Sequence, residues 1–201
     1  MIQTLKGSKI MTATAQRSAA TATRVEKQED VVTKPLARRV LAFSRIVIGF
    51  FFLWPFLDKT FGLGFSTPSE RAWINGGTPA QGFLGGVTGE EGTSPFKGIF
   101  EIFMNPFGDI LFMLGLLGIG VAMIAGAGLR IAAVAGTILM IFMYLAEWPV
   151  LMDGTTNPIM DSHWVEACLL LIAAVTLAGD TWGLGKWWGN QPVVQKHRWL
   201  R

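Results

Sequence analysis

Four long stretches of the chain are almost free of charged residues. They cover residues 40–57, 110–129, 131–146 and 164–179, and they are dense in Leu, Ile, Phe, Met, Ala and Gly. With its flanking residues, each stretch reaches the roughly 20 residues that a helix needs to cross a bilayer. In a soluble domain, four such helices would leave no amphipathic helices to cover them. The pattern therefore predicts an all-α integral membrane protein built as a four-transmembrane-helix bundle.

Polar segments at both ends complete the predicted domain organisation. Residues 1–38 are polar and rich in Ala and Thr, so they cannot bury a core, and we expect a disordered tail there. The membrane domain is expected to cover residues 39–190, followed by a basic tail at 191–201.

A long Gly-rich segment, residues 62–108, connects the first two predicted helices. Its stretch 94–107 is expected to form a short helix at the membrane surface. The side chains expected to point toward lipid are those of Phe96, Ile99, Phe100 and Phe103.

Basic residues are distributed unevenly between the predicted loops. Both tails and the short link at Arg130 are basic, whereas the link 147–162 contains three acids and no Lys or Arg. The positive-inside rule therefore places the N- and C-termini in the cytoplasm and the long loop outside. This placement accounts for the basic pI near 9.2 without binding to nucleic acid.

Composition excludes several kinds of redox centre. Cys168 is the one cysteine, so an intramolecular disulfide, a CxxC pair or an iron–sulfur cluster held by this chain alone is impossible. The two histidines, His163 and His197, are predicted at opposite faces of the membrane and cannot ligate one haem together. No dinucleotide or P-loop glycine pattern is present, and no metal site is predicted. Electrons passing through this protein would need a diffusible carrier such as quinone, or a partner's cofactor.

Charged residues at membrane depth are functional candidates because burying them in lipid is costly. Arg45 and Lys59 lie 14 residues apart in the first helix, as do Glu166 and Asp180 in the fourth, which is about 21 Å in each case. We therefore predict that these two helices are neighbours, joined by the pairs Lys59–Glu166 and Arg45–Asp180. The alternatives are an Arg45 that reaches the cytoplasmic interface and an Asp180 that is solvated just beyond the helix end.

A second group of candidates is predicted at the outer mouth of the bundle. His163, Glu166 and Glu147 could transfer protons near neutral pH, Lys59 could bind an anion, and aromatic side chains could hold a flat ring. The alternatives are an interfacial His163 with no special task and a Glu166 that is an ordinary acid of the first helical turn. The complete group consists of Asp58, Lys59, Tyr144, Glu147, Trp148, Asp161, His163 and Glu166.

Three segments resemble the DoxX/DoxD family of bacterial and archaeal membrane proteins. They are RIVIGFFFLWPFLDKTFG at 45–62, WINGGTPAQGFL at 73–84 and DSHWVEACLLLIAAVTLAGDTWGLGKWW at 161–188. Their order and spacing around four predicted helices carry the resemblance, which covers about residues 38–190.

The resemblance implies a multi-pass protein of a bacterial or archaeal plasma membrane. DoxD-like members are associated with thiosulfate:quinone oxidoreductase, which oxidises thiosulfate to tetrathionate, reduces quinone and has a second, small subunit. We therefore expect a membrane subunit of a quinone-linked oxidoreductase, with quinone as its ligand and no covalently bound cofactor. The alternatives are a non-catalytic scaffold subunit of a redox or respiratory complex and a small-solute permease. Expected partners are the lipid bilayer and either a small subunit, a redox protein or further copies of this chain.

Overall fold

The computed structural model describes residues 25–88, 94–151 and 155–201, which form helices and turns without strands. Three helices are long and apolar enough to cross a membrane: α3 (Pro35–Phe61), α6 (Pro106–Ala125) and α7 (Leu129–Ala146). A fourth apolar helix, α8 (Ser162–Val175), has 14 residues, or about 21 Å against a hydrocarbon core of about 30 Å. The predicted all-α character is confirmed for the described residues, and the three long apolar helices agree with the predicted multi-pass membrane protein. The fourth helix is shorter than predicted.

Short elements precede, connect and follow these helices. They are α2 (Gln28–Val31), η1 (Ser69–Arg71), η2 (Trp73–Asn75), α4 (Pro79–Thr88), α5 (Lys97–Phe100), η3 (Glu101–Phe103), η4 (Ala178–Asp180), α9 (Gly185–Gly189), α10 (Pro192–Lys196) and η5 (Arg198–Leu200).

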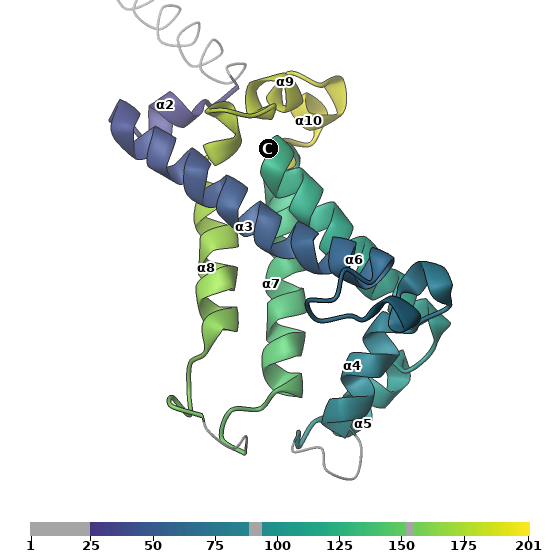
Figure 1. The fold of residues 1–201 in the computed structure, drawn as a ribbon. Coiled ribbons are helices and arrows are strands. Elements are labelled where there is room, and N and C mark those ends of the chain that lie inside the picture. The colour runs from purple at the N-terminus through teal and green to yellow at the C-terminus, as the bar shows by residue number, and fades with distance from the viewer. Residues whose placement is uncertain (1–24, 89–93, 152–154) are drawn as a thin grey trace, which may run out of the picture.

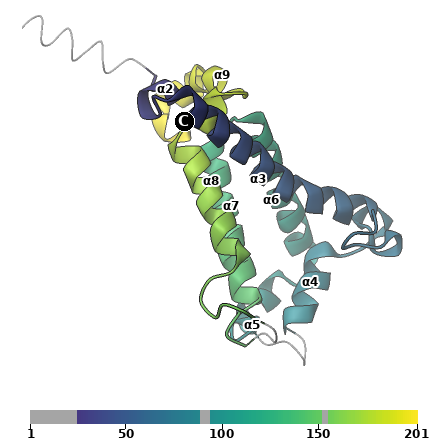
Figure 2. The ribbon, with the colours of Figure 1, turned by 60° about the vertical axis from the view of Figure 1, so that its left-hand side comes forward.

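The long helices pack as two pairs, α3 with α6 and α7 with α8. The pairs meet near α2, η4, α9, α10 and η5, which together are called the cap here (Figures 1 and 2). They diverge toward the opposite end, where α4 and α5 lie (Figures 1 and 2). The predicted contact between the first and fourth helices is also present, because α3 packs against α8 and η4.

Glycine allows the close approach of α3 and α6. A Cβ atom added to Gly120 would lie 2.8 Å from the backbone nitrogen of Leu53, and one added to Gly49 would lie 2.8 Å from Cγ1 of Ile124. Small residues at such contacts let helix backbones come together in lipid, where packing rather than water exclusion drives helix association.

Both predicted tails are folded where the structure describes them. Residues 25–38 were expected to be disordered, but they include α2 and the start of α3, and Gln28 is only 1% exposed. The basic tail 191–201 likewise forms α10 and η5, with Val194 buried. Each tail finds hydrogen-bond partners in the loop after α8, which composition alone does not reveal. Residues 1–24 of the predicted tail lie outside the described residues.

The expected orientation of the short outer helix is wrong for most of its aromatic residues. The rings of Phe100 and Phe103 pack against Phe142 of α7, with centroids 6.1 and 5.7 Å away, and Phe96 packs against Trp148 at 5.3 Å. Of the four residues, Ile99 is the exposed one. Because the helix pairs diverge here, the apolar face of α5 and η3 fills space beside α7 instead of facing lipid.

Candidate functional site

A polar cluster forms where α8 begins. The carboxylate of Asp161 accepts a hydrogen bond from the backbone N–H of His163 at 3.0 Å and thereby caps α8. Its second oxygen lies 2.8 Å from Nδ1 of the His163 imidazole. With the proton on Nδ1, His163 donates to Asp161 and presents Nε2 as a proton acceptor. Such a carboxylate–imidazole pair fixes the ring's orientation, as in other acid–base sites.

Glu166 lies one turn further along α8 and is 7% exposed. It is hydrogen-bonded to the side chain of Ser162, and it interacts electrostatically with His163, Asp161 and Glu147. The three predicted proton-transfer residues, His163, Glu166 and Glu147, are thus linked through their electrostatic interactions with Glu166, and with Asp161 they are called the polar cluster here.

Aromatic side chains border this cluster. The ring of Tyr144 makes edge contacts with Trp148 and Trp164, each at a centroid distance of 5.6 Å. The Tyr144 hydroxyl donates to the carbonyl of Ile159 at 2.7 Å and ties α7 to the segment before α8. Tyr144 and Trp148 were predicted here, and the structure adds Trp164.

Asp58 and Lys59 do not belong to the cluster. Asp58 is buried and accepts hydrogen bonds from the backbone and hydroxyl of Ser66 at 2.9 and 2.7 Å, which stabilises the turn after α3. Lys59 interacts electrostatically with Asp58. No ion pair between Lys59 and Glu166 occurs among the described residues, so this predicted pair is wrong.

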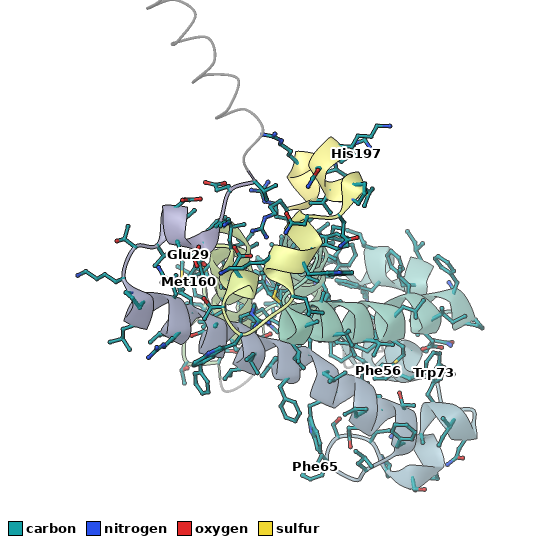
Figure 3. All side chains as sticks on the ribbon, turned by 90° about the horizontal axis from the view of Figure 1, so that it is seen from above. Glu29, Phe56, Phe65, Trp73, Met160 and His197 are labelled. Carbon is teal, nitrogen blue, oxygen red and sulfur yellow. The ribbon has the colours of Figure 1, made fainter. Side chains whose placement is uncertain are left out.

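The tilt of α3 explains this difference. Its end lies beside η2 and away from the start of α8 (Figures 1 and 2). Seen from above, Phe56 and Phe65 are displaced sideways from Met160, which precedes α8 (Figure 3). Equal spacing along two helices places their charges at the same depths only when the helix axes are parallel or antiparallel. The axis of α3 instead runs alongside α6, its main packing partner, and diverges from α8.

Arg45 is completely buried, and its predicted pairing with Asp180 is wrong. Its guanidinium donates to the backbone carbonyls of Met123, of Ile124 at 2.7 Å and of Trp182 at 3.0 Å. These three partners of the guanidinium lie within the protein. The positive charge of Arg45 stabilises the C-terminal end of α6, where carbonyl groups lack helical partners.

Two glycines make room for this guanidinium. A Cβ atom at Gly126 would lie 3.2 Å from Cζ of Arg45, and one at Gly183 would lie 3.1 Å from Nη2. The backbone of Gly126 also has a φ of 75°, in the left-handed region that favours glycine.

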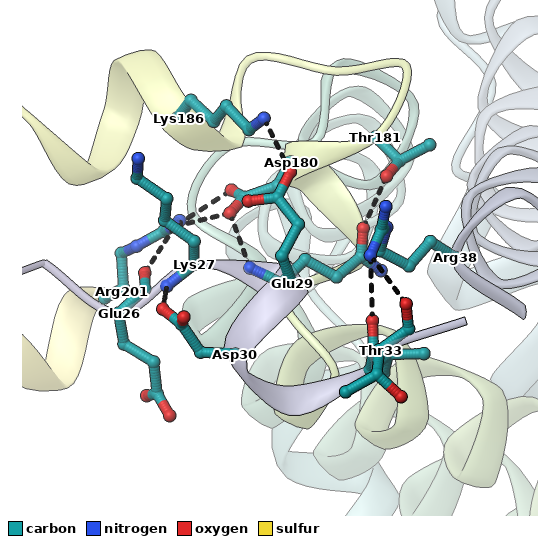
Figure 4. A network of polar contacts seen from close by, with 12 residues as sticks. Glu26, Lys27, Glu29, Asp30, Thr33, Arg38, Asp180, Thr181, Lys186 and Arg201 are labelled. Atoms are coloured by element: carbon teal, nitrogen blue, oxygen red, sulfur yellow. Dashed lines mark hydrogen bonds and ion pairs between the residues drawn. The ribbon is translucent and has the colours of Figure 1, made fainter. Parts of the chain in front are cut away.

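Asp180 is the centre of the cap. Its carboxylate pairs with the guanidinium of Arg201 at 2.8 Å and accepts the backbone N–H of Gln28 at 2.9 Å (Figure 4). The solvated alternative for Asp180 is also wrong, because its side chain is 1% exposed. The chain before α3 and the segment after α10 therefore share one buried carboxylate.

An exposed ion pair extends the cap network. Lys186 Nζ lies 3.0 Å from the carboxylate of Glu29 (Figure 4). The hydrogen bond from Lys186 lowers the pKa of the Glu29 carboxyl below its ordinary value.

An apolar cavity of about 440 Å³ lies at the diverging end of the bundle. Leu111 and Ile138, on its rim, are 50% and 52% exposed, so the cavity borders the surface that would face lipid. Ala146 lines its other end, directly before Glu147 of the polar cluster. Its walls come from α4, α5, η3, α6 and α7, and are formed by Ala80, Phe83, Leu84, Phe100, Phe103, Gly108, Leu111, Phe112, Gly115, Ile119, Ala135, Ile138, Leu139, Phe142, Met143 and Ala146.

Sequence reasoning did not find this cavity. It depends on the divergence of two helix pairs, which no local pattern encodes. One signal was available: Phe100 and Phe103 lie three residues apart on one face of a short helical segment, but that face was assigned to lipid. Among the described residues, no group of three His, Cys, Asp or Glu side chains could hold a metal ion.

Comparison with models of known protein families, with curated proteins and with solved structures found no match. Membership of the DoxX/DoxD family therefore stays a prediction from the sequence motifs.

Proposed function

We propose that this chain is the membrane subunit of a quinone-linked oxidoreductase whose electron donor is thiosulfate or a related sulfur compound. One combination of observations supports the proposal: Glu147, which interacts electrostatically with Glu166 next to the His163–Asp161 pair, directly follows Ala146 in the wall of an apolar cavity. Reduction of a quinone needs this combination, because the molecule is apolar and takes up protons together with electrons.

The overall reaction balances without a further reactant. Two thiosulfate ions lose one electron each and form the central S–S bond of tetrathionate. The quinone takes up these two electrons and two protons and becomes a quinol. Within this chain, Nε2 of His163 passes on a proton, Asp161 orients the imidazole, and Glu166 and Glu147 resupply protons. Tyr144 and Trp148 form the aromatic border of the site.

The sulfur compound is assigned to a partner subunit in this proposal. Lys59, the cation expected to bind the sulfur compound, lies outside the cluster. No described Lys or Arg forms an ion pair with Asp161, Glu166 or Glu147. The family resemblance, with its second small subunit, supports the same division of labour.

In the proposed topology, α8 is the fourth crossing and both ends of the chain are cytoplasmic. The contact between Gln28 and Asp180 supports this arrangement, because it joins the chain before α3 to the chain after α8. Ends that meet on one side of a membrane require an even number of crossings. If α3, α6 and α7 each cross, then α8 returns the chain, with η4 extending its length.

The experiment is thiosulfate-dependent reduction of a short-chain quinone by membranes of the native host, which contain any partner subunit. His163→Ala should lower turnover by about 10²-fold or more, the usual contribution of a positioned acid–base group. His197→Ala is the matched control, since this histidine is exposed in the cap. Equal turnover in the two variants, at equal amounts of protein, would contradict the proposal.

A non-catalytic scaffold is the second candidate, and the folded cap favours it. The buried Asp180–Arg201 pair holds both tail segments in one rigid unit that could dock a redox protein. On this alternative, His163→Ala leaves turnover of the complex unchanged. Asp180→Ala instead removes the partner from the complex purified in mild detergent.

A further inference from the structure

We propose that the apolar cavity binds the ring and the first part of the tail of a membrane quinone, which enters sideways from the lipid between α6 and α7. This inference rests on the proposed function and assigns its quinone site. The cavity volume of about 440 Å³ lies within the roughly 300–1,000 Å³ of pockets that bind small molecules.

The walls match a flat ring with an apolar tail. Phe100, Phe103 and Phe142 form an aromatic side, with edge contacts between Phe142 and each of the other two. Aromatic pairs of this kind present ring faces and edges that suit offset packing against another ring. Among the residues that the structure describes, no charged side chain lines the cavity, so a charged or strongly polar ligand would lose hydration there without compensation.

The route of entry follows from exposure. Leu111 of α6 and Ile138 of α7 line the cavity while half of each side chain faces outward. Between these two helices the chain therefore leaves a lateral opening toward the bilayer. A ligand dissolved in the membrane can enter there without passing through water.

The two ends of the cavity differ, and this difference orients the ligand. At the end of α7, Ala146 is buried in the cavity wall and Glu147 follows it. Phe96 continues the wall there and contacts Trp148 of the polar cluster. The quinone ring, which needs protons, thus lies at the Ala146 end, and the tail extends toward Leu111 and the lipid.

Gly115 offers a direct test, because it lines the cavity and an added Cβ atom would meet nothing within 4 Å. Gly115→Leu should therefore fill the cavity without disturbing the fold. Gly118→Leu is the matched control: it is in the same helix, is exposed, has equally open space, and lies outside the cavity. Binding of radiolabelled decylubiquinone is measured for both variants and the wild type in lipid nanodiscs.

We expect Gly115→Leu to weaken decylubiquinone binding at least about tenfold, while Gly118→Leu binds like the wild type. Equal binding by all three proteins would overturn the site. Native mass spectrometry showing a phospholipid that decylubiquinone does not displace would also overturn it. If Gly115→Leu fails to fold, Ala135→Leu, which also fills the cavity from an exposed position, takes its place. If Gly115→Leu selectively loses binding but His163→Ala leaves turnover unchanged, the proposed proton transfer is rejected and the quinone site stands.

Discussion

The carboxylate of Asp180 and the guanidinium of Arg201 form an ion pair of 2.8 Å in which the two side chains are 1% and 9% exposed. The same carboxylate accepts the backbone N–H of Gln28. The segment before α3 and the segment after α10 are therefore joined through one buried carboxylate. This contact explains why both predicted tails are folded next to the bundle.

Arg201→Met should destabilise the protein strongly. Removing one partner of a buried ion pair leaves the other charge without compensation and costs about 3–5 kcal/mol. The midpoint of unfolding in a denaturing detergent titration measures the loss. The control is Lys186→Met, which removes the exposed pair with Glu29 and should leave the midpoint unchanged. A similar midpoint for both variants would show that the cap contributes little to stability.

Arg45→Met should also destabilise the bundle, although it replaces a charge with an apolar side chain inside the membrane. Its loss leaves the carbonyls of Met123, Ile124 and Trp182 without their donor, which costs at least about 2 kcal/mol. Arg39→Met serves as the comparison, because Arg39 is exposed in the same helix. If Arg45→Met stabilised the protein, the buried arginine would have a functional role only.

Two glycines of α6 that are two residues apart should respond differently to alanine. Gly120→Ala places a Cβ atom 2.8 Å from the backbone of Leu53 and should cost about 1–3 kcal/mol through overpacking. Gly118→Ala meets open space and should be neutral or slightly stabilising, because alanine favours helix. Thermal unfolding of the two variants in one detergent decides the matter, and equal shifts would contradict the close contact of α3 with α6.

Asp161 has two tasks that substitution can separate. Asp161→Asn keeps an oxygen that can cap α8 but loses the carboxylate that holds Nδ1 of His163. It should therefore retain stability and lose quinone reduction. Asp161→Ala should lose the reduction and about 1 kcal/mol of stability as well. Full activity in the Asn variant would remove Asp161 from the proposed proton transfer.

Hydropathy was sufficient to predict the three helices that are long and apolar enough to span a membrane, because an uninterrupted apolar run of 20 residues has few other stable arrangements. The cluster at the start of α8 was also predictable. His163 and Glu166 lie three residues apart on one helical face, and Glu147 directly follows α7, which packs against α8.

The charge pairs were not predictable in the same way. Lys59 and Glu166 match in depth only if α3 runs alongside α8 over its full length, and the tilt of α3 is set by its glycine contacts with α6. Arg45 was expected to need an acid, yet backbone carbonyls at a helix end satisfy it. The partner of Asp180 is Arg201, which lies in a segment whose composition is typical of a solvated tail.

The most direct test of a quinone beside the His163 cluster is photo-crosslinking with an azido-quinone in nanodiscs, followed by peptide mapping. The account predicts that label concentrates on the cavity walls, at Phe100, Phe142 and Met143, and is competed by unlabelled decylubiquinone. Label spread over exposed positions such as Phe43 and Phe50 of α3, without competition, would contradict it.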